Sequence, residues 1–311
     1  MKNFHKRVDN ECTILLYHGV TKEESQGIEN HNLKHIKEID FIKQMDYVKE
    51  ECNPISIDDF ISYKKCKESL PPKSVIVSFD DGFKNNYTVA SPVLIERGIP
   101  AVFYISSGVI NTDIMFWVDD LGDCINRSKS KTLSVKLENK INFPISNNIE
   151  KIRALTEIKA YCKQSIVREK DRVVREVRMA TNITPSVASS KNYEKLNWDE
   201  VRDLHSNPLF TIGGHSLYHN ILSLIDDKII EQELRASIDL LEINLNSKIK
   251  HYSYPEGQTN HYNLRVINIL KNLGIVCSPS AMPGLNTIQS DLFNLKRTMV
   301  GFDTNIFPFF G

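Results

Sequence analysis

The chain has 311 residues, of which 41% are hydrophobic, so it can bury the core of one α/β barrel or of one domain with an insertion. Lysine plus arginine and aspartate plus glutamate each total 39, which gives a formal net charge of zero. No global field then attracts nucleic acid or an anionic membrane, and we expect neither as a partner. Six cysteines without paired spacing indicate reduced thiols.

No segment approaches the roughly 18 consecutive apolar residues that a membrane-spanning helix requires. The first apolar run, residues 13–17, is too short for the hydrophobic region of a signal peptide. We therefore expect a cytoplasmic protein without a transmembrane segment. Export of a chain whose signal peptide has already been removed would leave the same pattern.

Short apolar runs rich in β-branched and aromatic residues predict strands, and longer amphipathic stretches predict helices. The predicted strands cover residues 13–17, 75–79, 101–105, 211–212, 252–254 and 275–277. The predicted helices cover residues 36–50, 87–97, 228–245 and 262–273, the last followed by a glycine suited to a helix C-terminus. This alternation predicts βα units around a mainly parallel sheet.

Residues from about 111 to 195 break the alternation. They contain a possible hairpin at 132–145, turning near 138–140, and charged helical sequence at 149–179. We expect a single domain over residues 1–311 in which this segment is a partly helical insertion over the barrel rim. The sequence leaves open whether the insertion contacts substrate or only packs against the barrel.

An aspartate pair, Asp80 and Asp81, closes the predicted strand at 75–79. The carboxyl ends of strands are where α/β barrels place their chemistry. Adjacent side chains on an extended segment point in opposite directions, so we expect one carboxylate to bind a metal and the other to face the attacking water. Asp-Asp-Gly is also a common turn sequence, so the pair alone does not identify a site.

Two histidines, His215 and His219, stand four residues apart after Gly213 and Gly214. We expect a flexible diglycine approach to a short helix, which would place both imidazoles on one face. With one aspartate they form a familiar three-ligand set for a hydrolytic zinc that keeps a position open for water. Taken alone, the two could equally be surface or capping histidines.

These segments resemble the polysaccharide deacetylase family, also called the NodB-homology or carbohydrate esterase family 4 fold. Its Thr-Phe-Asp-Asp-Gly motif is matched by Ser-Phe-Asp-Asp-Gly at residues 78–82, and its His-Ser/Thr-x-x-His motif by residues 215–219. The resemblance implies a distorted (β/α)7 TIM-like barrel. It also implies that Asp80 is the catalytic base and that the metal ligands are Asp81, His215 and His219.

The resemblance extends to the branch that processes poly-N-acetylglucosamine, whose members carry a Tyr-His segment near the amino terminus. Here residues 15–20 read Leu-Leu-Tyr-His-Gly-Val. The branch implies that His18 is the general acid that protonates the leaving amine, a task suited to an imidazolium that titrates near neutrality. A lone histidine after a strand is otherwise an ordinary polar edge residue.

Two further segments resemble family motifs. Tyr254, Pro255 and Glu256 match an aromatic-Pro-Tyr-Gly motif, with glutamate where an aromatic often stands. The resemblance implies that this segment binds substrate through the backbone amide of Glu256 as oxyanion donor, while the glutamate side chain could disfavour an anionic substrate. Arg297 matches a late arginine that would pair with Asp80 and keep it ionised, or it could be an exposed cation at a strand edge.

The resemblance thus implies a metal-dependent hydrolase that removes an N-acetyl group from an amino sugar in a glycan or glycan precursor of surface polysaccharide metabolism. Zn²⁺ is the expected ion, although Co²⁺, Ni²⁺ or Fe²⁺ fits the same ligands. The missing export signal favours a nucleotide- or lipid-linked precursor over finished polymer. Hydrolysis of a non-sugar amide or cyclic imide is the second hypothesis and a non-catalytic glycan-binding relative the third. The sequence indicates no oligomeric state.

Overall fold

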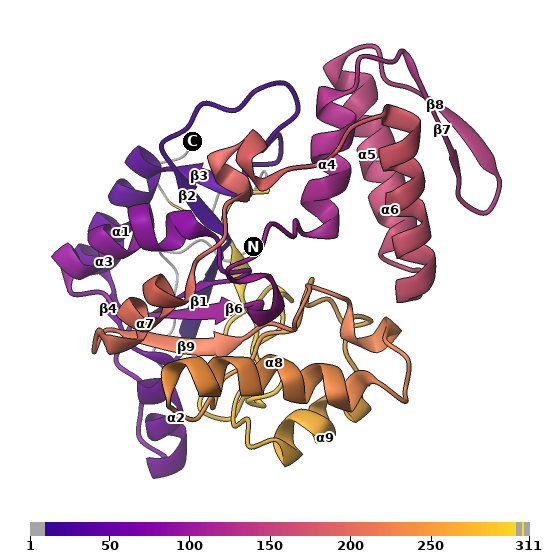
Figure 1. Cartoon of the computed structure of the whole chain (residues 1–311). Helices are drawn as coiled ribbons and strands as arrows, with labels where there is room; N and C mark the ends of the chain where they lie inside the picture. The colour runs from indigo at the N-terminus through magenta and orange to yellow at the C-terminus, as the bar shows by residue number, and fades with distance from the viewer. Residues whose placement is uncertain (1–9, 303–306, 308–311) are drawn as a thin grey trace.

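The computed structural model describes residues 10–302 and residue 307, so both ends of the predicted 1–311 domain lie outside the described part. Its centre is a six-stranded sheet in the order β10-β1-β5-β6-β9, with β4 beside the start of β5 (Figure 1). Every pairing between these strands is parallel, which confirms the predicted α/β class. The strands are β1 (Cys12–Tyr17), β4 (Asn53–Pro54), β5 (Ser74–Phe79), β6 (Ala101–Ile105), β9 (Phe210–Gly214) and β10 (Thr298–Met299).

The central strands are buried along their whole length. Every residue of β1, β5 and β6 is buried, so their sequences are continuous apolar runs instead of alternating patterns, as is typical of parallel strands covered on both faces. β1 and β5 pair in register from Cys12 with Ser74 to Tyr17 with Phe79. The residues that follow, His18 and Asp80, therefore leave the sheet at the same edge.

Two predicted strands are reduced to isolated bridges. Residues 252–254 and 275–277 contribute only the parallel bridges of Gly214 with Tyr252 and of His251 with Cys277. The chain then returns toward β10 through backbone hydrogen bonds from Ser280 to Leu295 and from Arg297 to Met282. Between β9 and β10 the barrel is therefore closed by single bridges and isolated hydrogen bonds instead of full strands, which accounts for its distortion.

Helices surround this sheet. The four predicted helices are present with shifted ends, and the first begins later than expected because Ile36 belongs to β3 (His35–Lys37), which pairs with β2 (Gly19–Thr21). A π-helical turn, η1 (Asn86–Ala90), opens the second. The helices outside residues 111–195 are α1 (Glu38–Glu51), α2 (Ile57–Cys66), α3 (Ser91–Arg97), α7 (Trp198–Ser206), α8 (Ile230–Leu245) and α9 (Leu264–Asn272), with 3₁₀ turns η2 (Ser107–Val109) and η5 (Leu222–Leu224).

Helix α2 was not predicted from the sequence. It begins with a capping box in which the Ser56 hydroxyl accepts from the Asp59 backbone amide and the Asp59 carboxylate accepts from the Ser56 amide. A serine followed three residues later by an acidic residue is a readable helix start, so the signal was present.

Residues 117–181 form a body beside the barrel with a separate hydrophobic core, to which Ile28 also contributes (Figure 1). The predicted hairpin is confirmed as two antiparallel strands, and the charged stretch at 149–179 is helical as predicted, divided into two helices. Its elements are α4 (Trp117–Arg127), β7 (Thr132–Lys136), β8 (Lys140–Pro144), α5 (Asn148–Cys162) and α6 (Val167–Thr181), followed by 3₁₀ turns η3 (Val187–Ser189) and η4 (Lys191–Tyr193). We call residues 117–181 the insertion; the division of the chain into one domain with an insertion stays a prediction.

The predictions about cysteines and membrane helices can be compared with the described residues. No disulfide bond joins the six cysteines in the described part of the chain, as the scattered spacing predicts. None of the helices in the described ranges combines the length and the apolar character that crossing a bilayer requires.

Candidate active site

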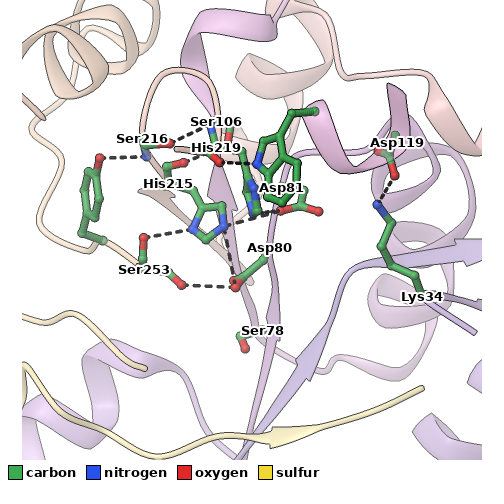
Figure 2. A network of polar contacts seen from close by, with 12 residues as sticks. Lys34, Ser78, Asp80, Asp81, Ser106, Asp119, His215, Ser216, His219 and Ser253 are labelled. Atoms are coloured by element: carbon green, nitrogen blue, oxygen red, sulfur yellow. Dashed lines mark hydrogen bonds and ion pairs between the residues drawn. The ribbon is translucent and has the colours of Figure 1, made fainter. Parts of the chain in front are cut away.

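The predicted site residues come together at the carboxyl edge of the sheet. His18 follows β1, Asp80 and Asp81 follow β5, and His215 follows β9. Because the carboxyl ends of parallel strands lie at one edge, segments more than 100 residues apart in the sequence meet there (Figure 2). These side chains and His219 line one cavity of about 330 Å³.

Asp81, His215 and His219 form a compact, buried cluster. The Asp81 Oδ1 atom lies 3.4 Å from His215 Nε2 and 3.2 Å from His219 Nε2. One ligand atom from each residue lies within 4.8 Å of the others. Asp81 Oδ1 makes no hydrogen bond of regular geometry within the described part of the chain, although it is buried. One carboxylate oxygen and two imidazole nitrogens so close together suit a divalent metal ion.

The orientation of His215 also fits a metal ligand. Its Nδ1–H donates to the backbone carbonyl of Ser253 at 2.9 Å, so its Nε2 faces Asp81. Histidines that bind metals usually donate their other ring N–H in this way, which fixes the tautomer and the ring plane. The Ser106 hydroxyl in turn donates to the His215 carbonyl at 2.8 Å (Figure 2).

The expected helix for His215 and His219 is wrong. Residues 215–219 form a loop in which Ser216 and His219 have φ of +63° and +57°. The Ser216 hydroxyl accepts from the His219 amide, and the Tyr252 hydroxyl accepts from the Ser216 amide. Trp117 of the insertion donates its indole N–H to the His219 carbonyl at 3.3 Å. The imidazoles converge because the loop folds back, not because helical spacing aligns them.

The interpretation of Gly213 and Gly214 as a flexible approach is also wrong, since both lie buried in β9. A Cβ atom on Gly213 would lie 2.6 Å from the Tyr104 ring, and one on Gly214 would lie 2.6 Å from the Tyr252 ring. These glycines are therefore explained by close packing of aromatic rings on the strand, which holds the loop that follows.

Asp80 and Asp81 do not point in opposite directions. The His215 Nε2 atom lies 3.9 Å from Asp80 Oδ2 as well as 3.4 Å from Asp81 Oδ1. The strand has ended at Phe79, and Asp81 has φ of +81°, so the alternation of an extended segment no longer applies. A tight turn brings both carboxylates to one centre.

Asp80 forms a buried, two-pronged ion pair with Arg297. The two distances, from Nη1 to Oδ1 and from Nη2 to Oδ2, are both 2.7 Å. The Ser253 hydroxyl donates to Asp80 Oδ2 and accepts from Arg297. Burial raises the pKa of Asp80, but the charges of Arg297 and His215 outweigh it, so the pKa is lowered and the carboxylate stays ionised. The expected pairing is confirmed, and the alternative of an exposed Arg297 is wrong.

The cluster also shifts its own pKa values. Burial opposes the ionised form of Asp81, but the charge of His219 and the close contacts with both imidazoles place the pKa of Asp81 well below its usual value. Burial lowers the pKa of His219, but the charge and close contact of Asp81 raise it by more, so the net shift is upward. Asp81 is therefore a carboxylate at neutral pH, as a metal ligand must be.

His18 lies in the same cavity, at the end of β1. Its Nδ1 atom is buried, and no hydrogen-bond partner for it lies among the described residues. Burial lowers the pKa of His18, while the nearby Asp81 and Asp80 carboxylates act in the opposite direction. The downward net shift makes its imidazolium a stronger acid than that of a free histidine; its role as general acid stays a prediction.

Within the segment of residues 254–256, Tyr254 lies in the core and only Glu256 lines the cavity. The Tyr254 ring is buried, stacks on Tyr262 and donates its hydroxyl to the Phe293 carbonyl, so it supports the loop and is absent from the cavity wall. Pro255 does not line the cavity either. Glu256 does, and within residues 10–302 nothing accepts a hydrogen bond from its backbone amide, which leaves that donor available.

Sequence reasoning missed two residues that organise the site. Ser253 holds His215 through its carbonyl, and Asp80 with Arg297 through its hydroxyl. Tyr252 holds the loop at Ser216. The only sequence signal was their place in a predicted strand directly before the Tyr-Pro motif. Nothing local indicates that they face residues 36 or more positions away.

The sheet and the cluster at its edge define an α/β protein with a candidate metal centre. The family model described as polysaccharide deacetylase matches residues 67–278, which is more than half of the chain. The chain therefore belongs to the polysaccharide deacetylase family. Comparison of the sequence with curated proteins finds no match.

Several solved structures have a similar fold. IcaB from Ammonifex degensii is 16% identical with a TM-score of 0.60, over 94% of this chain and 92% of that chain. The Streptococcus pyogenes deacetylase PplD, solved in complex with acetate, is 16% identical with a TM-score of 0.62 over 95% of each chain. A de-N-acetylase from Aggregatibacter actinomycetemcomitans is 18% identical with a TM-score of 0.59, over 95% of this chain and 97% of that chain. At these identities the likeness shows the fold.

Proposed function

We propose that this protein is a metal-dependent carbohydrate N-deacetylase that hydrolyses the N-acetyl group of an amino sugar in a glycan or glycan precursor. The observation that carries the proposal is the buried Asp81-His215-His219 cluster beside the Asp80–Arg297 ion pair, in one cavity. Membership of the polysaccharide deacetylase family supports the substrate class. The similar folds of a de-N-acetylase and of a deacetylase solved with acetate support the same reaction.

Asp81, His215 and His219 would hold the metal ion. The buried Oδ1 of Asp81 and the Nε2 of His215, fixed by the Ser253 carbonyl, suit this role. Zn²⁺ is the ion we propose, with Co²⁺, Ni²⁺ or Fe²⁺ compatible with the same donors. When bound, such an ion polarises a carbonyl group and makes water more acidic.

The side chains around the cluster supply the proton transfers. Asp80 is ionised and lies within 3.9 Å of His215 Nε2, so it is placed to take the proton of the attacking water. Arg297 and Ser253 fix the carboxylate and leave it little freedom to rotate. The backbone amide of Glu256 donates to the oxygen that becomes negative as the amide carbonyl is attacked. His18 protonates the amine as it leaves.

The direct test is acetate release from UDP-N-acetylglucosamine, chito-oligosaccharides and a lipid-linked amino sugar, by metal-free protein and by protein reconstituted with Zn²⁺ or Co²⁺. We expect release that requires the metal from at least one of these. Metal binding without release from any of them would contradict the proposal and favour hydrolysis of a non-sugar amide or a binding role. A cytoplasmic location and a precursor of surface glycan remain part of the proposal.

A further inference from the structure

Three lysines line the cavity, and two of them are already paired. Lys34 lies 2.6 Å from Asp119 of α4 (Figure 2), and Lys163, just after α5, lies 2.6 Å from Glu256. Each pair brings one positive and one negative charge to the wall, so neither adds net charge. The expectation that Glu256 repels an anionic substrate therefore does not hold, because Lys163 neutralises it.

The third lysine, Lys159, has no such partner. It lies on α5 one helical turn before Lys163 and faces the same cavity. No carboxylate within the described residues forms an ion pair or hydrogen bond with its ammonium group. Burial lowers the pKa of Lys159 to about 8, an effect reinforced by Lys163 and opposed by Glu256. Lys159 therefore remains mainly protonated at neutral pH.

Lys159 is half-buried, and an ammonium group that is partly shielded from water without an anion is unfavourable. A ligand that brings a negative charge to the ammonium removes this cost. The attraction between the two charges is stronger in the reduced dielectric of the cavity than in water. The insertion would thus make its largest polar contribution to binding when the ligand carries an anion. Neutral sugar hydroxyls would leave the ammonium only weakly compensated.

We propose that the amino sugar bound by this protein carries one anionic substituent and that Lys159 binds this substituent. This inference rests on the proposed function and narrows its substrate class. The substituent is a phosphate ester, as in a sugar nucleotide or a phospholipid-linked sugar, or a carboxylate on the sugar itself. Both anions satisfy a single ammonium group, which, unlike arginine, does not require a planar two-pronged partner.

The test uses metal-loaded Asp80→Asn protein, in which turnover is slowed enough to measure binding by calorimetry. The ligands are N-acetylglucosamine as the neutral reference, N-acetylglucosamine 1-phosphate for the phosphate source and N-acetylmuramic acid for the carboxylate source. We expect at least one anionic ligand to bind about 10-fold or more tightly than the reference, because the charge is recognised in a partly desolvated site. The ligand that binds more tightly identifies the source.

Variants at Lys159 locate the anion. Lys159→Met should abolish the preference, Lys159→Arg should retain most of it, and Lys140→Met, an exposed lysine of β8 outside the cavity, should leave it unchanged. Equal affinity for all three ligands would overturn the inference. A preference that persists in Lys159→Met would also overturn it, since the anion would then bind elsewhere, for example at the metal.

The failure of this inference can be separated from that of the proposed function. In protein with Asp80 intact, Lys159→Met should raise KM for the anionic substrate about 10-fold and leave kcat nearly unchanged, because the lysine acts on binding. Acetate release without any charge preference would contradict the Lys159 assignment and leave the proposed function intact. A Lys159-dependent charge preference without acetate release would support the assignment and contradict the deacetylase activity.

Discussion

The barrel edge and the insertion form two walls of one cavity and hold their charges differently. On the barrel wall, Asp80 is locked by Arg297, and Asp81 lies against two imidazoles, all of them buried. On the insertion wall, Asp119 pairs with Lys34 and Lys163 pairs with Glu256, whereas the half-buried Lys159 has no carboxylate partner in the described ranges. The barrel wall is thus fixed for one reaction, whereas the insertion wall is left open to a ligand.

This difference separates chemistry from selection of substrate. Groups that transfer protons or bind metal must be held in fixed geometry, which buried ion pairs and hydrogen bonds achieve. A group that recognises a substituent needs an unmet interaction that the substrate completes. Substitutions on the barrel wall should therefore affect turnover and metal binding, and those on the insertion wall should affect substrate preference.

The largest effect is expected for His215→Ala, which removes one donor of the cluster. Metal content should fall, and acetate release should fall by roughly 1,000-fold or more, because the metal contributes several kcal/mol to the transition state. Elemental analysis and a coupled acetate assay measure both. His205→Ala, on α7 and outside the cavity, is the matched control. Full activity in His215→Ala would remove this residue from the metal site.

Asp80→Asn should separate proton transfer from metal binding. The amide keeps the shape of the side chain but cannot accept the proton, so kcat should fall by about 100- to 10,000-fold. Bound metal should stay close to the level of the unmodified protein, since the proposed ligands are Asp81, His215 and His219. An Asp80→Asn protein that retains full turnover would show that another group is the base.

Arg297→Met should affect both stability and pH dependence. The change leaves the buried Asp80 carboxylate without its partner, so the free energy of unfolding should fall by about 3–5 kcal/mol. Because Arg297 lowers the pKa of Asp80, its loss should move the acidic limb of the pH–rate profile to higher pH. Arg297→Lys keeps the charge and should cost less on both counts. An unshifted acidic limb in folded Arg297→Met would contradict the role of Arg297.

The smallest effect is a gain in stability for Lys159→Met. The pKa of Lys159 is about 8 in the folded chain, and its ordinary value is about 10.4. Between these values the unfolded state binds more protons, so the penalty for burying this lysine is full below pH 8 and disappears as pH rises. Lys159→Met should raise Tm by roughly 2 °C at pH 7 and by less at pH 9.5.

Lys140→Met is the control for this thermal experiment, since its lysine is exposed. It should change Tm little at either pH. A difference between Lys159→Met and the unmodified protein that is the same at both pH values would show that Lys159 is not destabilised by burial.

The strands, and the residues that gather at their carboxyl ends, could be predicted because their signals are local. β1, β5 and β6 are buried on both faces, so their sequences are continuous runs of β-branched and aromatic residues. The segments at 252–254 and 275–277 have similar runs of apolar residues, yet each pairs with its neighbour only through a single bridge. Local composition shows that a run is buried, but it does not show how many hydrogen bonds its neighbour supplies.

The geometry of the site could be predicted only in part. Motif spacing gave Asp80, Asp81, His215 and His219, but not the loop that brings the histidines together. That loop depends on distant donors and acceptors such as Trp117 and Tyr252. The position of Lys159 likewise depends on how the insertion packs beside the barrel, and its helix pattern does not contain that information.

The central claim is that Asp81, His215 and His219 hold the metal on which acetate release depends. Its most direct test is to add Zn²⁺ stepwise to metal-free protein and to measure bound metal and acetate release in the same samples. We expect release to rise in proportion to bound metal up to about one equivalent and His215→Ala to show neither bound metal nor release. Release that is independent of bound metal, or unaffected in His215→Ala, would contradict it.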